Sequence, residues 1–276
     1  MTPEQITPET CIVRNTAARK GRTRAIEPGP TASRHLHYGR IILDARGPIM
    51  RFATGELETG LLCLGGEAVV TAAGHTHTLT RFDALYVPRD ADVTISAASG
   101  CDIAEIGAPV SRPHPVQFVS FSAAQTDPSL KFETGGPAAR RTVSVLIGKN
   151  IEAGRIMAGV TFSQPGNWTS WPPHEHAAML EEAYLYIEMP PPGFGVQLVY
   201  ANAREPELAT IVREGDVVLM PQGYHPNVGA PGSAINFVWM MAANREDVDR
   251  QYGVVNVQPD FAALGSGLDA ARTATR

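Results

Sequence analysis

The sequence predicts an all-β protein with two similar β domains, and three observations favour this class. The 276-residue chain has 26 Gly and 22 Pro, so breaks come too often for long helices. The apolar segments between the breaks are short, β-rich and spaced by about ten residues, which is typical of antiparallel sandwiches and small barrels. One strand pattern also occurs twice, far apart in the chain.

Strands are expected in the first half at residues 11–13, 38–43, 59–64, 67–71, 76–79, 82–88, 92–96 and 102–106. Between the first two of these strands lies a basic cluster, which is expected to form a solvated loop. Its members are Arg19, Lys20, Arg22 and Arg24. Residues 107–139 are rich in Pro, Ser, Gly and Ala and are predicted to be a connector.

The second half repeats this organisation, with strands expected at residues 142–147, 155–162, 182–188, 196–200, 209–212, 216–220 and 234–241. The tail 265–276 is small and polar and is expected to fray or to form a short packed helix.

A repeated unit indicates that one domain was duplicated. Residues 82–88 (FDALYVP) and 215–221 (GDVVLMP) both place an Asp before a mostly apolar run and a Pro, at an offset of 133 residues. Asp83 and Asp216 are expected to fix turns rather than to perform chemistry. With similar strand counts on each side, the repeat predicts an N-terminal domain at 1–130 and a C-terminal domain at 131–276.

Charge and composition exclude several classes of partner. A net charge of −5 argues against nucleic acid or an anionic membrane as the main partner. The three cysteines show no paired spacing, which is typical of a reduced, intracellular protein. The N-terminus lacks the pattern of a signal peptide, and no apolar run approaches the roughly 18 residues of a membrane span. A cytoplasmic protein is expected, and we also expect a homo-oligomer.

The strongest chemical signal is a set of histidines with a nearby carboxylate. His174 and His176 are two residues apart, so in an extended chain both side chains point to the same face. A carboxylate follows within six residues at the head of an apolar β run, and His225 comes just after a second such run. Three imidazoles and one Glu that converge in a barrel predict a divalent-metal site with room for water or substrate.

Either Glu181 or Glu182 supplies the carboxylate, and strand parity favours Glu182. Along a strand, Glu182 shares its face with Tyr184 and Tyr186, whereas Glu181 points to the opposite face. Glu181 is then an outer partner or a solvent-facing charge. The offset of 133 residues places Asp92 opposite His225 and no histidine opposite the other two ligands, so only the second domain is expected to bind metal.

Two further His-x-His pairs occur, at residues 35–37 and 75–77. Neither is followed by a carboxylate at the start of a strand, so neither is expected to bind metal.

Several other side chains are candidates for the same cavity. Tyr184, Tyr186, Tyr200 and Tyr224 are either acid/base or hydrogen-bonding groups of the cavity or packed aromatic residues. Gln197 lies in a predicted strand and can reach the cavity. Arg140 and Arg141 lie at the junction of the two domains, where they either clamp a carboxylate or are surface charges.

These residues carry a resemblance to a known family. The His-x-His, Glu and His set with the Gly-Asp-strand-Pro unit resembles the cupin pattern, which implies a double-stranded β-helix in two copies, a bicupin. More narrowly, the chain is similar to the 5-deoxy-glucuronate isomerases of inositol catabolism. The matching segments are 141–143 (RTV), 166–176 (GNWTSWPPHEH), 180–184 (LEEAY), 193–200 (GFGVQLVY) and 223–226 (GYHP). The resemblance is strong over 140–245 and weak over the first 130 residues.

The resemblance implies metal ligands at His174, His176, Glu182 and His225, with zinc expected and Mn, Fe or Ni also compatible. It implies an aldose–ketose isomerase of carbohydrate metabolism that converts 5-deoxy-glucuronate to 5-dehydro-2-deoxy-gluconate. The metal would act as a Lewis acid, and a positioned base would carry the proton. Glu181, Tyr224 and Tyr186 are the candidates for proton transfer. Arg141, Gln197 and Tyr200 are the candidates for substrate binding.

Two departures from the family pattern leave the substrate open. Four residues separate His176 from Glu181, where family members carry a longer acidic insertion, and Met241 is followed by Ala-Ala-Asn instead of Ala-Gly-Pro. The first alternative is an isomerase of 5-keto-4-deoxyuronate, as in pectin breakdown. A second is an Fe-dependent cupin dioxygenase, and a third is a non-catalytic sugar sensor, although no DNA-binding segment is present.

Overall fold

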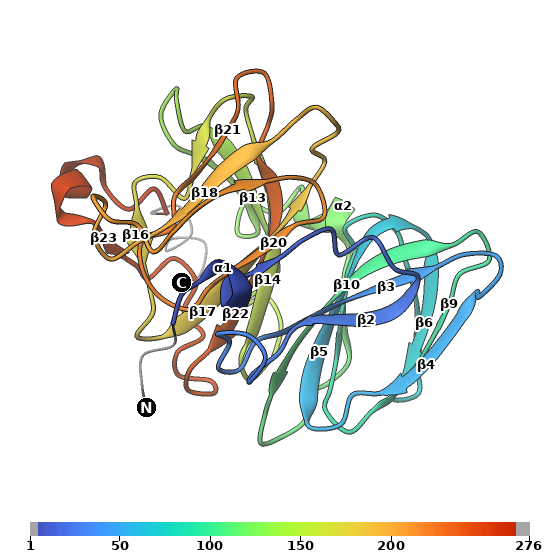
Figure 1. Ribbon diagram of the computed structural model, residues 1–276. Coiled ribbons are helices and arrows are strands. Elements are labelled where there is room, and N and C mark those ends of the chain that lie inside the picture. The colour runs from blue at the N-terminus through green and yellow to red at the C-terminus, as the bar shows by residue number, and fades with distance from the viewer. Residues whose placement is uncertain (1–4, 269–276) are drawn as a thin grey trace.

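A computed structural model describes residues 5–268 of the chain (Figure 1). Nearly all of its regular structure is β, as expected. Figure 1 shows two lobes, with β2–β6, β9 and β10 in one and β13, β14 and β16–β18 in the other. The tail 265–276, expected to fray or to form a short packed helix, falls largely on residues 269–276, which lie outside the described residues.

The first lobe contains a six-stranded and a four-stranded antiparallel sheet. The six-stranded sheet has the order β11-β8-β5-β10-β3-β2 and consists of β2 (Gly21–Ile26), β3 (His37–Leu43), β5 (Leu57–Gly66), β8 (Ala84–Val87), β10 (Cys101–Pro109) and β11 (Gln117–Val119). The four-stranded sheet has the order β4-β9-β6-β7 and consists of β4 (Ile49–Ala53), β6 (Ala68–Ala72), β7 (His75–Leu79) and β9 (Asp92–Ser96).

The second lobe contains a seven-stranded, a four-stranded and a two-stranded sheet. The seven-stranded sheet has the order β1-β20-β17-β22-β14-β13-β12 and consists of β1 (Ile12–Val13), β12 (Lys131–Thr134), β13 (Arg141–Ile147), β14 (Ile156–Ser163), β17 (Leu180–Ile187), β20 (Val217–Met220) and β22 (Asn236–Ala243). The four-stranded sheet has the order β15-β21-β18-β19 and consists of β15 (Trp168–Thr169), β18 (Gly195–Val199), β19 (Leu208–Val212) and β21 (Asn227–Gly229). The two-stranded sheet pairs β16 (His174–Glu175) with β23 (Asn256–Val257).

Three short helical segments complete the described chain: α1 (Pro8–Cys11), α2 (Phe121–Ala124) and the 3-10 helix η1 (Pro259–Leu264). None of the helices within residues 5–268 has the length and apolar character needed to cross a bilayer.

The strand orders of the two lobes correspond position by position. Strands β11, β8, β5, β10, β3 and β2 of one large sheet match β1, β20, β17, β22, β14 and β13 of the other. The Asp of each repeated unit fixes a turn, as expected. Asp83 Oδ2 accepts the amide of Thr80 at 2.9 Å, and Asp216 Oδ2 accepts the amide of Arg213 at 3.1 Å. Strands β2 to β11 belong to the sheets of the first lobe, and strands β12 to β23 belong to the sheets of the second lobe. Strand β1 is the exception, because it joins the large sheet of the second lobe.

Three apolar clusters hold the sheets together. In each lobe one cluster fills the space between the large and the four-stranded sheet, with Leu61 and Val70 as members in the first and Tyr184 and Val199 in the second. The third cluster joins the two large sheets and contains residues of both lobes, such as Leu62 and Leu185. Burial of apolar area on this scale is the main stabilising contribution to such a fold.

Side chains on β17 alternate between two of these clusters. Ala183 and Leu185 pack between the lobes, whereas Tyr184 and Tyr186 point into the second lobe. This strand is buried along its whole length, because it lies in the middle of the large sheet with a cluster on each face.

The expected loop at the basic cluster is wrong for Arg22 and Arg24, which lie on strand β2. Both guanidinium groups contact the carboxylate of Glu105, which is 1% exposed, and Arg22 binds it through two hydrogen bonds of 2.7 and 2.6 Å. A buried carboxylate requires such partners. The pairing joins residues some eighty positions apart, so no local pattern indicates it.

The expected connector at 107–139 is also only partly correct. It contains the end of β10 and all of β11, α2 and β12. Of these elements, β11, α2 and β12 are three or four residues long, which is too short for a periodic pattern to reveal them.

Candidate metal centre

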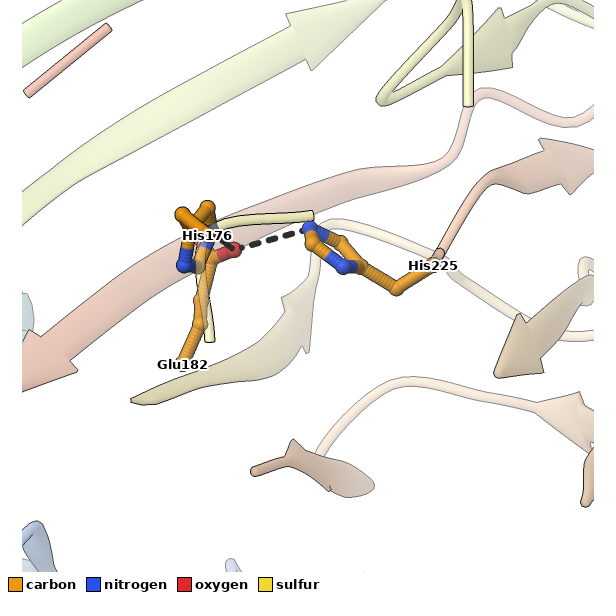
Figure 2. Close-up of side chains that lie close together, drawn as sticks. All are labelled: His176, Glu182 and His225. Carbon is orange, nitrogen blue, oxygen red and sulfur yellow. Dashed lines mark hydrogen bonds and ion pairs between the residues drawn. The ribbon is translucent and has the colours of Figure 1, made fainter. Parts of the chain in front are cut away.

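Three side chains of the second lobe converge on one point (Figure 2). One ligand atom each from His176, Glu182 and His225 lies within 4.8 Å of the others. Oε2 of Glu182 is 3.1 Å from Nε2 of His176 and 3.1 Å from Nε2 of His225. All three residues are at most 4% exposed.

Separate elements of the second lobe bring these groups together. Glu182 projects from β17, His176 follows β16, and His225 lies in the loop between β20 and β21. The short strand β16 is held in place by β23, in which Val257 pairs with His174. The position of His174 and of the adjoining His176 therefore depends on a strand contributed by the C-terminal part of the chain.

Backbone carbonyls orient all three imidazoles of the predicted site. The Nδ1 atoms of His174, His176 and His225 lie 2.9, 3.0 and 2.9 Å from the carbonyl oxygens of Pro172, Leu180 and Gly223. A carbonyl only accepts hydrogen bonds, so each Nδ1 carries the proton. In the neutral ring Nε2 is then the atom with a free lone pair, as in histidines that bind metals.

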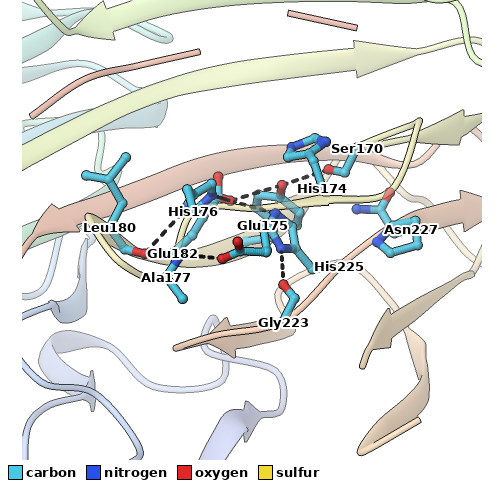
Figure 3. Close-up of polar contacts among 12 residues, drawn as sticks. Ser170, His174, Glu175, His176, Ala177, Leu180, Glu182, Gly223, His225 and Asn227 are labelled. Atoms are coloured by element: carbon cyan, nitrogen blue, oxygen red, sulfur yellow. Dashed lines mark hydrogen bonds and ion pairs between the residues drawn. The ribbon is translucent and has the colours of Figure 1, made fainter. Parts of the chain in front are cut away.

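His174 lies beside this group, but it is not one of the three residues whose ligand atoms converge. Its ring centroid is 5.2 Å from that of His225 and 6.5 Å from that of His176. It lines the same pocket as His176 and Glu182 and is 5% exposed. Three of the four predicted ligands thus meet at one point, and the ring of the fourth is their neighbour (Figure 3).

The charges in the site depend on these contacts. Burial alone would raise the pKa of Glu182, but His176 and His225 hold it at about 2. Burial alone would lower the pKa of His176, but the hydrogen bond and charge of Glu182 raise it above the usual 6.5. For His174, burial and the charge of His225 outweigh the opposing effects of the Pro172 carbonyl and the Glu182 charge, and they lower its pKa to about 3.

The donor set fits a divalent cation. Nε2 of His225 is buried and forms no hydrogen bond with any described residue, although it lies near Glu182. Two ligands that are each about 2.1 Å from a metal ion lie roughly 3.0 to 3.4 Å apart. The observed nitrogen-to-oxygen distances of 3.1 Å match this spacing. A cation would accept the lone pairs that otherwise face one another.

A pocket opens next to these groups and carries one buried cation, Arg141. Arg141 lines this pocket and is 3% exposed. Its guanidinium group donates hydrogen bonds to the carbonyl oxygens of Ala139 at 3.0 Å and Trp171 at 3.1 Å. Burial lowers the pKa of Arg141. Among residues 5–268 the guanidinium group binds these two carbonyl oxygens and forms no ion pair with a carboxylate.

Hydroxyl groups line the same pocket. The Tyr184 hydroxyl is 2.7 Å from Oγ of Ser170 and donates to Oε2 of Glu182 at 3.3 Å. Burial raises the pKa of Tyr184 and of Tyr252, a second lining phenol, so both remain protonated at neutral pH. Ser170 has a φ of 50°, a strained conformation for a residue other than glycine.

Four of the other candidates lie outside the pocket lining. Tyr186 donates to Oε1 of Gln197 at 2.5 Å, and Nε2 of Gln197 donates to the carbonyl of His225 at 2.9 Å. Gln197 therefore supports the backbone of the His225 loop. Tyr200 donates to Gln258 at 2.9 Å, and its backbone pairs with that of Tyr224.

Glu181 points away from the pocket. Its carboxylate accepts hydrogen bonds from the backbone amides of Arg34, His35 and Leu36 in the first lobe, at 2.7, 2.6 and 2.6 Å. This placement agrees with strand parity and does not support Glu181 as a proton carrier, because the residue is buried on the opposite face of β17.

Sequence reasoning missed Ser170, Thr161 and Tyr252 as lining residues. Ser170 belongs to the segment 166–176 singled out above, so its place before the histidines was an available signal. Tyr252 has no such signal, since it enters the pocket from a loop that follows the last long strand.

The two His-x-His pairs outside the predicted site, at residues 35–37 and 75–77, lie in different parts of the first lobe. His75 is exposed on β7, and His77 stacks on Phe118 with ring centroids 5.3 Å apart. Among the described residues, neither they nor His35 and His37 belong to a cluster that could hold a metal.

Comparison with known proteins gives consistent results. A family model described as the KduI/IolB family matches residues 11–262. The chain is 28% identical over 220 residues to a 5-deoxy-glucuronate isomerase of Geobacillus kaustophilus, covering 72% of this chain and 76% of that protein. It is 32% identical over 212 residues to a 4-deoxy-L-threo-5-hexosulose-uronate ketol-isomerase of Kineococcus radiotolerans, covering 71% of each.

A solved structure shares the fold. The crystal structure of an IolB-like protein from Salmonella typhimurium LT2 matches with a TM-score of 0.80 at 22% identity, covering 92% of this chain and 98% of that one.

Proposed function

The chain belongs to the KduI/IolB family, and we propose that it is a metal-dependent isomerase of sugar acids that converts 5-deoxy-glucuronate to 5-dehydro-2-deoxy-gluconate. Such a reaction interconverts an aldose and a ketose by moving one proton between two adjacent carbons and a second proton from the hydroxyl oxygen to the carbonyl oxygen on those carbons. It would be a step of inositol catabolism. The relative from Geobacillus kaustophilus supports this substrate.

One observation carries the proposal. A buried arginine without an acidic partner among residues 5–268 lines the same pocket as His174, His176 and Glu182. A guanidinium group that has been removed from water can bind a planar carboxylate strongly, because the two groups form two parallel hydrogen bonds. A ligand that has a carboxylate at one end and reactive oxygens at the other would fill both requirements of the pocket.

The proposed metal ligands are His174, His176, Glu182 and His225, and the proposed metal is zinc. The mixed nitrogen and oxygen donor set and the absence of a redox step in the reaction support zinc. When bound, the ion would act as a Lewis acid toward the carbonyl and hydroxyl oxygens of the substrate.

The remaining roles follow from position. Arg141 would bind the substrate carboxylate. Tyr184 and Tyr252 keep their protons at neutral pH and would donate hydrogen bonds or a proton to substrate oxygens. Ser170 and Glu182 would orient the Tyr184 hydroxyl through their hydrogen bonds to it. Tyr186, Gln197 and Tyr200 would support the site indirectly.

The proposed architecture is a bicupin, with a double-stranded β-helix at residues 1–130 and another at 131–276. The matching strand orders of the two large sheets and of the two four-stranded sheets support this duplication. Only the second copy would bind metal.

A second substrate is favoured by a specific observation. The 4-deoxy-L-threo-5-hexosulose-uronate ketol-isomerase of Kineococcus radiotolerans has the higher identity of the two relatives, 32%. A uronate also carries the carboxylate that Arg141 would bind. The proposed reaction class is the same, so the two candidates differ only in the sugar.

Metal analysis coupled to an isomerase assay on both sugar acids tests the proposal. Purified protein should contain about one zinc per chain, lose turnover after chelation and regain it when zinc is added. His174→Ala should fold normally and be inactive. Turnover of either sugar by folded, metal-depleted protein would contradict metal dependence, and the ratio of the two kcat/KM values would identify the substrate.

A further inference from the structure

A loop of the first lobe lies directly behind the metal centre of the second. The amides of Arg34, His35 and Leu36 all donate to the carboxylate of Glu181, which is fully buried. Glu181 is adjacent to Glu182 on β17, so the loop holds the strand at the point from which the proposed carboxylate ligand projects.

The side chain of Arg34 holds further segments of the site. Its guanidinium group donates to the carbonyl of Pro221 at 2.7 Å, to the carbonyl of Ala177 at 3.4 Å and to Oδ1 of Asn244 at 3.3 Å. Ala177 directly follows His176, and Pro221 begins the loop that carries His225. Asn244 reinforces the arrangement, because its Nδ2 also donates to Ala177 at 3.0 Å.

We propose that Arg34 and Glu181 form an inter-lobe clamp that positions the metal ligands. The clamp connects one loop of the first lobe to the three segments that carry His176, Glu182 and His225. It rests on the proposed function, since it requires that these residues bind a metal. The first lobe then has a defined task, which is to hold the metal-binding segments of the second lobe in register. Arg34 and Glu181 are positioning residues and touch neither metal nor substrate.

The corresponding contact in the opposite direction provides a matched control. Glu58 on β5 is fully buried and accepts the amides of Gly154, Arg155 and Ile156 at 2.8, 2.6 and 2.7 Å. Strand β5 matches β17 in sheet order, and β14, which begins at Ile156, matches β3. Glu58 thus joins the two lobes with the same chemistry as Glu181, but none of its hydrogen-bond partners adjoins a proposed metal ligand.

The test compares Arg34→Met, Glu181→Gln and Glu58→Gln with the wild type after removal of metal. Cobalt(II) is the probe, because its visible absorption reports ligand geometry and competition with a chelator gives its affinity. Unfolding in urea measures the stability of each variant. Residues that support metal ligands typically contribute about 10- to 100-fold to metal affinity. Arg34→Met and Glu181→Gln should lose that factor and change the cobalt spectrum, whereas Glu58→Gln should lose stability but bind cobalt within about threefold of the wild type.

The outcomes separate this clamp from the metal centre itself. Folded Arg34→Met and Glu181→Gln proteins that bind cobalt as tightly as the wild type would overturn the clamp and leave the metal centre intact. Equal weakening in Glu58→Gln would also overturn it, because the effect would then reflect general stability. A wild type that takes up no cobalt would refute both proposals. If Arg34→Met does not fold, Arg34→Lys should retain the charge, lose part of the contacts and show an intermediate loss of affinity.

Discussion

Removal of His174 should make the metal-free protein less sensitive to acid. The pKa of His174 is lowered to about 3 in the native state by burial and by the charge of His225, whereas an unfolded histidine has a pKa of about 6.5. Between these values the unfolded chain binds one more proton than the native chain does. Stability therefore rises with pH across this range and is lost on acidification.

The magnitude follows from the two pKa values. From pH 7.5 to 4.5 the unfolded state gains nearly one full proton at position 174 and the native state gains almost none. The free energy of unfolding should fall by about 2.5 kcal/mol from this group alone, at about 1.4 kcal/mol for each pH unit below 6.5. Other groups titrate in the same range, so the comparison must be with a variant.

His174→Asn is the suitable variant, because an Asn amide can replace Nδ1 in donating to the carbonyl of Pro172. The assay is urea unfolding of chelator-treated protein at pH 7.5 and 4.5, followed by tryptophan fluorescence. The wild type should lose about 2.5 kcal/mol more than His174→Asn between the two pH values. His77→Asn, outside the pocket, should behave as the wild type does. Equal losses in the wild type and His174→Asn would refute the reasoning.

Two further substitutions test the pocket and the sheet behind it. Arg141→Met should lower kcat/KM for a sugar acid by about 30- to 150-fold, since a charge-assisted contact contributes about 2 to 3 kcal/mol. Arg140→Met, at the exposed neighbouring position, should leave kcat/KM unchanged. Equal kcat/KM values for the two variants would contradict carboxylate binding by the buried Arg141. Gly159→Ala should lower the free energy of unfolding by about 2 kcal/mol or more, because the added Cβ would overlap the ring of Trp239. At Gly136 an added Cβ would meet no atom within 4 Å, so Gly136→Ala should leave the free energy of unfolding in urea nearly unchanged.

Much of the fold was predictable from short-range patterns. Turn residues and apolar runs located most of the long strands, including β5, β14, β17 and β22. Alternation along a strand also distinguished two adjacent carboxylates, because a period of two places Glu182 with Tyr184 and directs Glu181 to the opposite face. These inferences hold because they depend only on the local geometry of an extended backbone.

The same reasoning does not select among residues that share a face. Tyr184 and Tyr186 point into the same cluster, but only Tyr184 lines the pocket, and Tyr186 lies against Gln197. The difference is the position of each residue along the strand relative to the pocket, which depends on how the sheets pack. Candidates chosen by parity alone therefore included Tyr186 and Gln197 together with the lining residues.

By itself, the sequence determined the β class, the histidine and glutamate set and the face on which Glu182 lies, since spacing along one extended segment is sufficient for each. Only the tertiary structure decided that Arg34 of the first lobe reaches the segments of His176 and His225 and that Arg141 is buried beside them. The Arg34 contacts join segments that are 143 and 187 residues apart in the chain. They arise from the packing of whole sheets, which no local pattern encodes.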